Sequence, residues 1–243
     1  MNTSILPVRL GSLSPMQSRR IAFTENPRNL GFAGIRARAM GPTGKLWKPG
    51  RMLTVSFFSK GPEKLKAAIY ELGRSWIDQT GANLQMQRAE DNDSSAEIRI
   101  QCAPEAYCNG THLGTDILDT GSVNLLLCLE PGHELFEFSV LHEFGHVFGL
   151  DHEHQHPEAD IPWNARAAGY YASELGGASE EELQEQVFRK RSSADLINTG
   201  YDRSSVMHYP VSQYVTSGDW TVGINSSLSD KDIEFMRLAY PHE

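Results

Sequence analysis

The chain has 243 residues, 40% of them hydrophobic, which is enough length and apolar content to bury an ordinary core. Its net charge of −9 is unevenly spread. Residues 1–60 carry ten Lys and Arg against the single Glu25, which leaves twelve basic and thirty acidic residues, or −18, in the rest. An acidic body repels phosphate backbones, so we expect no nucleic-acid partner. No run of eighteen apolar residues occurs, so we expect no transmembrane segment.

The first 44 residues are rich in Gly, Pro and Arg and show no sustained period. We interpret residues 1–44 as a basic N-terminal extension or pro-segment, and we expect ordered structure from near Leu46 onward, within a catalytic domain over 45–243. The scattered basic residues could dock onto the acidic body or serve as a membrane or nucleic-acid tail. The opening "MNTSILPVRLGS" lacks the apolar centre of a signal peptide.

The middle of the chain alternates strand and helix patterns. The β-rich run 53–58 predicts a strand, and helical spacing over 62–81, with Pro at the start and Gly at the end, predicts an amphipathic helix. The runs 96–101 and 123–129 predict two further strands. Cys102 and Cys108 lie six residues apart and could form a disulfide, and three reduced thiols are an equally good interpretation.

The second half predicts three helices, over 136–149, 179–190 and 229–239. The first is apolar enough to be buried. Each of the other two begins with Ser followed three residues later by Glu or Asp, which is the pattern of a capping box.

Five of the nine histidines lie in the stretch "HEFGHVFGLDHEHQH", which runs from His142 to His156. His142 and His146 are four residues apart on the predicted helix, so both imidazoles lie on one face, about 5 to 6 Å apart at Cβ. Glu143 lies about 100° further around the helix. Its carboxylate can therefore reach a water on a metal ion without occupying a coordination position.

Gly149 and His152 complete the pattern. Gly149 can adopt the left-handed conformation that ends a helix, so the chain can turn back and bring His152 to the same ion. Three neutral imidazoles with an open fourth position are typical of catalytic zinc. With both residues included, the motif should arise by chance in roughly one chain in ten thousand. Surface or core histidines and a purely structural zinc site are the alternatives, and the uncoordinated Glu143 argues against the latter. Since three ligands suffice, we expect His154 and His156 in supporting or rim positions.

The stretch "HEFGHVFGLDH" resembles the HExxHxxGxxH motif of the metzincin metallopeptidases, and "SVMHYP" over 205–210 resembles their Met-turn. The sequence SxMHY and the Glu153 that follows His152 are similar to the astacin form. Matrixins have a similar sequence around the histidines but lack a tyrosine two residues after the Met-turn methionine. The resemblance is therefore to astacin-like metzincins, and it covers residues 45–243.

The resemblance implies a zinc site with three protein ligands, His142, His146 and His152. It further implies that Glu143 is the general base, that Met207 forms an apolar floor below the metal, and that Tyr209 is a retractable fifth ligand that hydrogen-bonds the tetrahedral intermediate. In astacins the glutamate at the position of Glu153 helps to bury the mature N-terminus. No cleavage point is visible in this chain, and a solvated charge is the alternative.

The resemblance also implies the fold and the activity. We expect an α+β zincin/metzincin catalytic domain, with a twisted mixed sheet, two long helices and a mostly irregular C-terminal half, and with "SVNLLLCLE" over 122–130 as the sheet edge that pairs with substrate. We expect a secreted, monomeric zinc endopeptidase that hydrolyses internal bonds of peptide or protein substrates through a metal-activated water. The alternatives are a zinc amidase acting on a non-protein or cell-wall peptide, and an inactive zincin that serves as a binding module.

Overall fold

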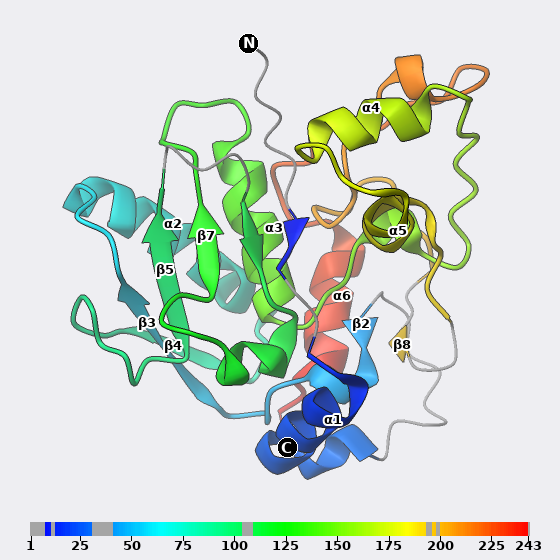
Figure 1. The fold of residues 1–243 in the computed structure, drawn as a ribbon. Helices are drawn as coiled ribbons and strands as arrows, with labels where there is room; N and C mark the ends of the chain where they lie inside the picture. Colours follow the sequence, from blue (N-terminus) through cyan, green and yellow to red (C-terminus); the bar gives the residue numbers. More distant parts are fainter. Residues whose placement is uncertain are drawn as a thin grey trace.

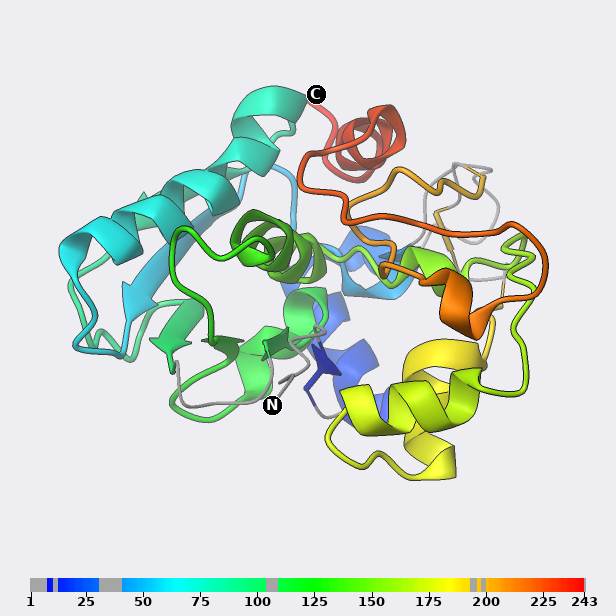
Figure 2. The same cartoon turned by 90° about the horizontal axis from the view of Figure 1, so that it is seen from above.

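The computed structural model describes residues 8–10, 13–30, 41–103, 109–192, 196–197 and 200–242. A mixed sheet and two long helices form one half of the molecule, and short helices and loops form the other (Figure 1; Figure 2). Within the described residues, no helix combines the length and the apolar character needed to cross a membrane.

The main sheet has six strands in the order β1-β6-β7-β5-β3-β4. Their bounds, in the same order, are Val8–Arg9, Gly110–Thr111, Leu125–Leu127, Ile98–Cys102, Met52–Phe57 and Gln85–Arg88. The pair β6–β7 is antiparallel, and the other four neighbouring pairs are parallel. A separate two-stranded antiparallel ladder joins β2 (Gly41–Pro42) to β8 (Leu196–Ile197).

Strands β3, β5 and β7 overlap the three runs that the sequence predicts as strands. The prediction that 122–130 forms the sheet edge is wrong, because β7 pairs with β5 on one side and with β6 on the other. Strand β6 has only two residues, Gly110 and Thr111, which is too short for an alternating pattern to signal it. The edge of the sheet on this side is β1, which pairs with β6.

Helices α2 (Glu63–Thr80) and α3 (Phe136–Val147) are the two long helices that the sequence predicts. Helix α2 ends at Gly81, whose φ of 65° is the left-handed conformation expected of a C-terminal glycine. The two helices pack closely where Gly73 faces Phe144, since a Cβ on Gly73 would lie 2.4 Å from the Phe144 ring. Nε1 of Trp76 also donates to the carbonyl of Leu141, at 2.9 Å. These contacts set α3, and the histidines it carries, against a rigid support.

The C-terminal half contains α4 (Ala167–Glu174), α5 (Glu180–Leu183), which continues as the π-helical turn η5 (Gln184–Phe188), and α6 (Asp230–Ala239). The predicted capping boxes are present at the starts of α5 and α6. Helix α4 was not predicted. Residues of this half form a second apolar cluster, made of Ala167, Tyr171, Leu183, Val187, Val211, Val215 and Val222. Helix α6 lies beside α2 and joins the two halves (Figure 2).

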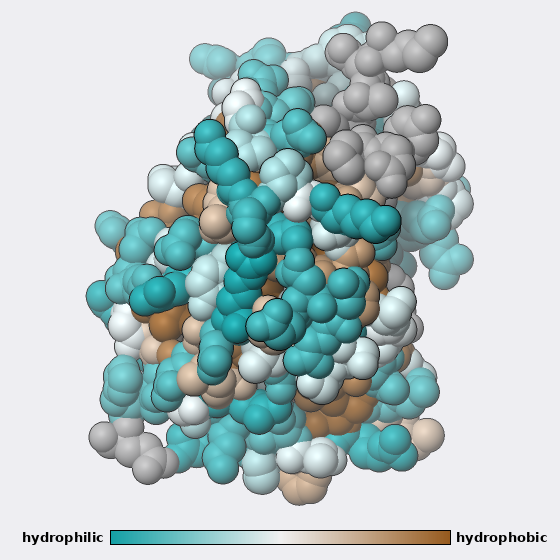
Figure 3. Space-filling model, turned by 90° about the vertical axis from the view of Figure 1, so that its left-hand side faces the viewer, coloured by the Kyte–Doolittle hydropathy of each residue, from teal (hydrophilic) through white to brown (hydrophobic). Residues whose placement is uncertain are grey.

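Short 3-10 turns connect the larger elements: η1 (Pro27–Leu30), η2 (Thr43–Lys45), η3 (Gly114–Asp119), η4 (Glu153–Gln155) and η7 (Gln213–Val215). The face seen from the left of Figure 1 is mostly hydrophilic, with its apolar residues in small separate spots (Figure 3). On this face the described residues therefore form no continuous apolar patch.

A helix also forms within the N-terminal extension. Helix α1 (Pro15–Glu25) packs against η3, where Oγ of Ser18 donates to Oδ1 of Asp116 at 2.5 Å. Nδ2 of Asn26, which follows α1, donates to the carbonyl of Trp47 at 3.0 Å. The expectation that ordered structure begins only near Leu46 is thus wrong for this segment. The sequence shows no helical period here because only two residues of the helix, Ser18 and Ala22, are buried.

Candidate active site

Local backbone geometry brings three histidines together. Helix α3 carries His142 and His146 one turn apart, with ring centroids separated by 4.7 Å. Gly149 then adopts a φ of 89°, as its predicted role in the turn requires, and its N–H donates to the carbonyl of His146 at 2.9 Å. The reversed chain returns His152 to the helix, so that the Nε2 atoms of His146 and His152 are 3.0 Å apart.

Backbone carbonyls set the orientation of the two helical rings. Nδ1 of His142 lies 2.9 Å from the carbonyl oxygen of Val206, and Nδ1 of His146 lies 2.8 Å from that of Leu150. A ring that donates from Nδ1 keeps its lone pair on Nε2, which is the usual arrangement of a histidine that binds a metal. One ligand nitrogen from each of His142, His146 and His152 lies within 4.8 Å of the other two, and all three residues are buried.

The charge states of the site suit a divalent metal. Burial lowers the pKa of His142 and His152 well below 6.5, so both rings are neutral at physiological pH. Within the described residues, Nε2 of His142 and both carboxylate oxygens of Glu143 are buried without a hydrogen-bond partner. Buried polar atoms are normally paired. The residues present therefore fit a zinc ion and a water molecule beside it.

Glu143 and Tyr209 face the same region. Burial raises the pKa of the Glu143 carboxyl well above 4.5. Burial, followed by the charge of Glu143, raises the pKa of Tyr209 well above 10, so its phenol stays protonated and can donate a hydrogen bond. The Tyr209 ring lies 4.6 Å from the His152 ring, centroid to centroid, and stacks on His154 at 4.2 Å.

The predicted Met-turn lies directly against α3. Met207 is buried, and a Cβ placed on Gly145 would lie 2.3 Å from its Sδ, so the glycine allows the turn to approach the helix. Asp232, near the start of α6, holds the turn: Oδ1 accepts from the hydroxyl of Ser205 at 2.6 Å, and Oδ2 accepts the N–H of Val206 at 3.0 Å. The sequence singles out Asp232 only as a capping residue, and its contact with the Met-turn was missed.

His154 and His156 lie outside the three-histidine cluster, as expected, but both are buried and neither occupies a rim position. Nε2 of His154 lies 3.0 Å from the carbonyl oxygen of Gln186, and Nδ1 of His156 accepts the N–H of Glu158 at 3.0 Å. Glu153 is also buried, so its charge is not solvated. Its Oε1 accepts the N–H of Asp202 at 2.8 Å, and burial raises its pKa well above 4.5.

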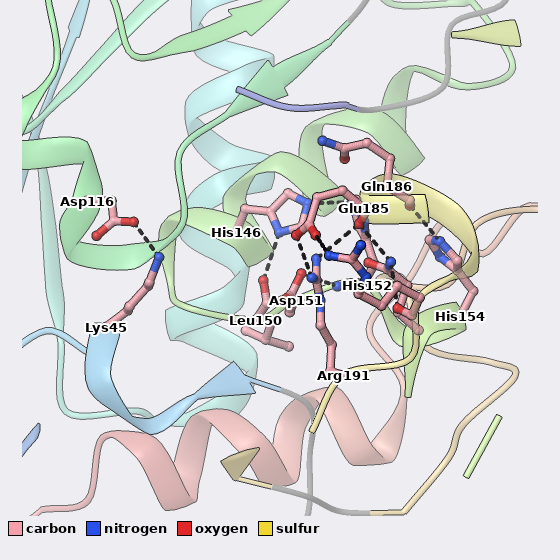
Figure 4. Close-up of polar contacts among 12 residues, drawn as sticks. Lys45, Asp116, His146, Leu150, Asp151, His152, His154, Glu185, Gln186 and Arg191 are labelled. Atoms are coloured by element: carbon pink, nitrogen blue, oxygen red, sulfur yellow. Dashed lines mark hydrogen bonds and ion pairs between the residues drawn. The ribbon is translucent and has the colours of Figure 1, made fainter. Parts of the chain in front are cut away.

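Two charged residues that the sequence analysis passes over meet beside the third histidine (Figure 4). Nε of Arg191 lies 3.1 Å from Oδ2 of Asp151, and the other carboxylate oxygen of Asp151 accepts the N–H of His152 at 2.9 Å. Arg191 belongs to an Arg-Lys-Arg run that is typical of a solvated surface. Nothing in its local sequence signals a buried position.

Comparison with known proteins bears on the class. No protein-family model matches the chain. Zinc metalloproteinase dpy-31 of Teladorsagia circumcincta is 26% identical in an alignment that covers 94% of this chain and 36% of that protein. The chain therefore spans about a third of the length of this curated relative.

Solved structures share the fold. A structure of myroilysin matches with a TM-score of 0.75 and 27% identity, covering 84% of this chain and 98% of myroilysin. High choriolytic enzyme 1, a hatching enzyme zinc-protease of the medaka fish Oryzias latipes, matches with a TM-score of 0.55 and 16% identity, covering 85% and 96% of the two chains. At that identity, the second match shows the fold alone.

The mixed sheet, the paired long helices and the histidine cluster above a Met-turn define an α+β zincin of the metzincin class, as the sequence predicts. Within that class the chain resembles the astacin-like proteins, as its sequence motifs predict. The name of the curated relative describes that protein as a zinc metalloproteinase.

Proposed function

We propose that the protein is a zinc-dependent endopeptidase that cleaves internal bonds of peptide or protein substrates. The proposal rests on the convergence of His142, His146 and His152. Beside them lies the buried carboxylate of Glu143, which makes no hydrogen bond within the described residues. Zinc held by three histidines supplies a Lewis acid that polarises a carbonyl group and lowers the pKa of water toward 7.

The chain's own residues supply the remaining chemistry. Glu143 takes a proton from the attacking water as general base and delivers it to the departing amine. A carboxylate suits both transfers, because it can accept the proton from water and hold it until the amine needs it. Tyr209 donates a hydrogen bond to the oxyanion that develops on the substrate. Met207 is buried against Gly145 of the helix that carries His142 and His146, and it supplies an apolar side chain next to the site.

The outer edge of β6 is our candidate for substrate pairing. Strand β6 is attached to α3, since Nδ2 of Asn109 donates to Oγ of Ser139 at 3.1 Å. An extended peptide on this edge would gain main-chain hydrogen bonds whatever its sequence. In the structure β1 pairs with the same edge, where Val8 faces Gly110 and the N–H of Leu10 donates to the carbonyl of Thr111 at 3.0 Å.

The position of β1 supports a pro-segment role for residues 1–44, because β1 would compete with substrate for β6. Deletion of residues 1–10 should raise kcat/KM on a peptide substrate, whereas deletion of residues 1–7, which leaves the three contacting residues in place, should not. Equal rates for both shortened proteins and the full chain would remove the proposed competition.

Digestion of denatured casein with and without a zinc chelator tests the main proposal. We expect internal cleavage that the chelator abolishes and that added zinc restores. Cleavage of cell-wall peptides without cleavage of casein would instead support an amidase, and binding of either substrate without cleavage would support an inactive zincin. A purified protein that retains no zinc would contradict all three.

A further inference from the structure

The chain that follows the third histidine is bound to one later segment. The N–H of Arg191 donates to the carbonyl of Gln155 at 2.8 Å. In return, Nε2 of Gln155 donates to the carbonyls of Glu185, at 2.8 Å, and Arg189, at 3.0 Å. The turn η5 and the residues after it are therefore hydrogen-bonded to η4, which comes directly after His152.

The side chain of Arg191 extends from this segment to Asp151, the residue that precedes His152 (Figure 4). It is 15% exposed and lies between two carboxylates, with Nη1 2.7 Å from Oε1 of Glu185 and Nε 3.1 Å from Oδ2 of Asp151. Asp151 is itself buried, and its Oδ1 accepts the N–H of His152. One oxygen of the Asp151 carboxylate thus pairs with the guanidinium of Arg191, and the other accepts the backbone N–H of His152, a proposed zinc ligand.

We propose that Arg191 is a positioning residue for His152, acting through Asp151. The guanidinium holds the Asp151 carboxylate in the orientation that accepts the N–H of His152, and this contact fixes the direction from which the imidazole approaches His146. The inference rests on the proposed function, because it assumes that the three histidines bind zinc. It makes zinc affinity depend on a side chain that lies forty residues later, in the C-terminal half.

The physical reason is the cost of a buried charge. Without Arg191, the Asp151 carboxylate loses its cationic partner in a site where water replaces it poorly. The carboxylate would then rotate toward other donors or toward solvent, and the N–H of His152 would lose its acceptor. Residues that orient a metal ligand typically affect affinity 10- to 100-fold when they are replaced.

Zinc affinity in the full-length protein, measured by competition with a chromogenic chelator, tests the proposal. Arg191→Met should raise the Kd about 10- to 100-fold. Arg189→Met is the matched control, because Arg189 also pairs with Glu185, at 3.0 Å, but is 59% exposed. It should change the Kd less than about twofold, as expected for an exposed ion pair.

A double variant distinguishes the positioning of His152 from a general contribution to stability. In Asp151→Asn/Arg191→Met, the neutral amide needs no cation and its oxygen still accepts the N–H of His152, so affinity should recover much of what Arg191→Met loses. A purely structural role for Arg191 would lower the Tm of Arg191→Met but leave the Kd of the folded protein unchanged, which would overturn the proposal.

If Arg191→Met does not fold, Arg191→Lys decides. An ammonium group cannot bridge two carboxylates as a guanidinium does, so the Kd should still rise several-fold, and an unchanged Kd would again overturn the proposal. A wild-type protein that binds no zinc would overturn the proposed function and this inference together. Wild-type binding with an unaffected Arg191→Met would overturn the inference alone.

Discussion

The carboxylate of Asp232 accepts the backbone N–H of Val206 at 3.0 Å and thereby ties the Met-turn to the first turn of α6. The carbonyl of the same Val206 lies 2.9 Å from Nδ1 of His142. A capping residue of the last helix and the first proposed zinc ligand therefore contact opposite ends of one residue. The orientation of that ligand depends on how firmly α6 is formed.

The ionisation of Asp232 gives a prediction for stability. Burial raises its pKa from 3.8 to about 6. Because the folded-state pKa is the higher one, its contribution to stability is complete below pH 3.8 and declines as the pH rises through about 6. The free energy of unfolding of the wild type, minus that of Asp232→Asn, should fall by at most about 3 kcal/mol over this interval. Urea unfolding at a series of pH values measures the difference, and a constant difference would contradict the prediction.

The contact between Gly145 and Met207 predicts the result of adding a single methyl group. Gly145→Ala would place a Cβ 2.3 Å from Sδ of Met207, and the overpacking should lower stability by about 1 to 3 kcal/mol. Gly169→Ala, in α4, is the matched control. Its Cβ would meet nothing within 4 Å, and the better helix propensity should stabilise the protein by about 0.5 to 1 kcal/mol. Thermal unfolding of the two variants should therefore shift in opposite directions.

Substitutions of Glu143 and of His146 should have different effects on zinc content and turnover. Glu143→Gln keeps the histidine cluster intact but removes the base, so the variant should bind zinc normally and lose about 10² to 10⁴ in kcat. His146→Ala removes a proposed ligand and should purify with little zinc. Metal analysis beside peptide-cleavage assays distinguishes the two variants. Full turnover by Glu143→Gln would contradict the proposed role of the carboxylate.

The hydroxyl of Tyr209 can be tested apart from its ring. Tyr209→Phe keeps the stacking on His154 and the packing against His152, so fold and zinc content should be unchanged. Loss of one donor to the developing oxyanion should lower kcat by about 10² with little effect on KM. If KM alone rises, Tyr209 contacts the substrate before reaction and does not stabilise the oxyanion.

Several features that depend on neighbours along the chain could be predicted from the sequence. Helix α2 could be predicted to its final residue because Gly81 marks the left-handed stop. The histidine cluster could be predicted because a spacing of four residues aligns two rings and Gly149 returns the third. The capping box at Ser229 was visible for the same reason.

Features that depend on distant partners could not be predicted. Strand β6 has two residues and exists because β7 and β1 lie on either side of it. Helix α1 buries few side chains, so its place depends on single hydrogen bonds such as that from Ser18 to Asp116. The pairing of Arg191 with Asp151 joins positions forty residues apart, and no local pattern encodes it.

Strand β1 has a consequence for the colloidal behaviour of the molecule. It is the outermost strand of the sheet, and it covers β6 with only two paired residues. An uncovered strand edge can pair with any other extended chain, including the same edge of a second copy. Removal of β1 would therefore open the sheet edge both to an extended peptide and to self-association, so the shortened protein is best assayed in dilute solution or with peptide in excess.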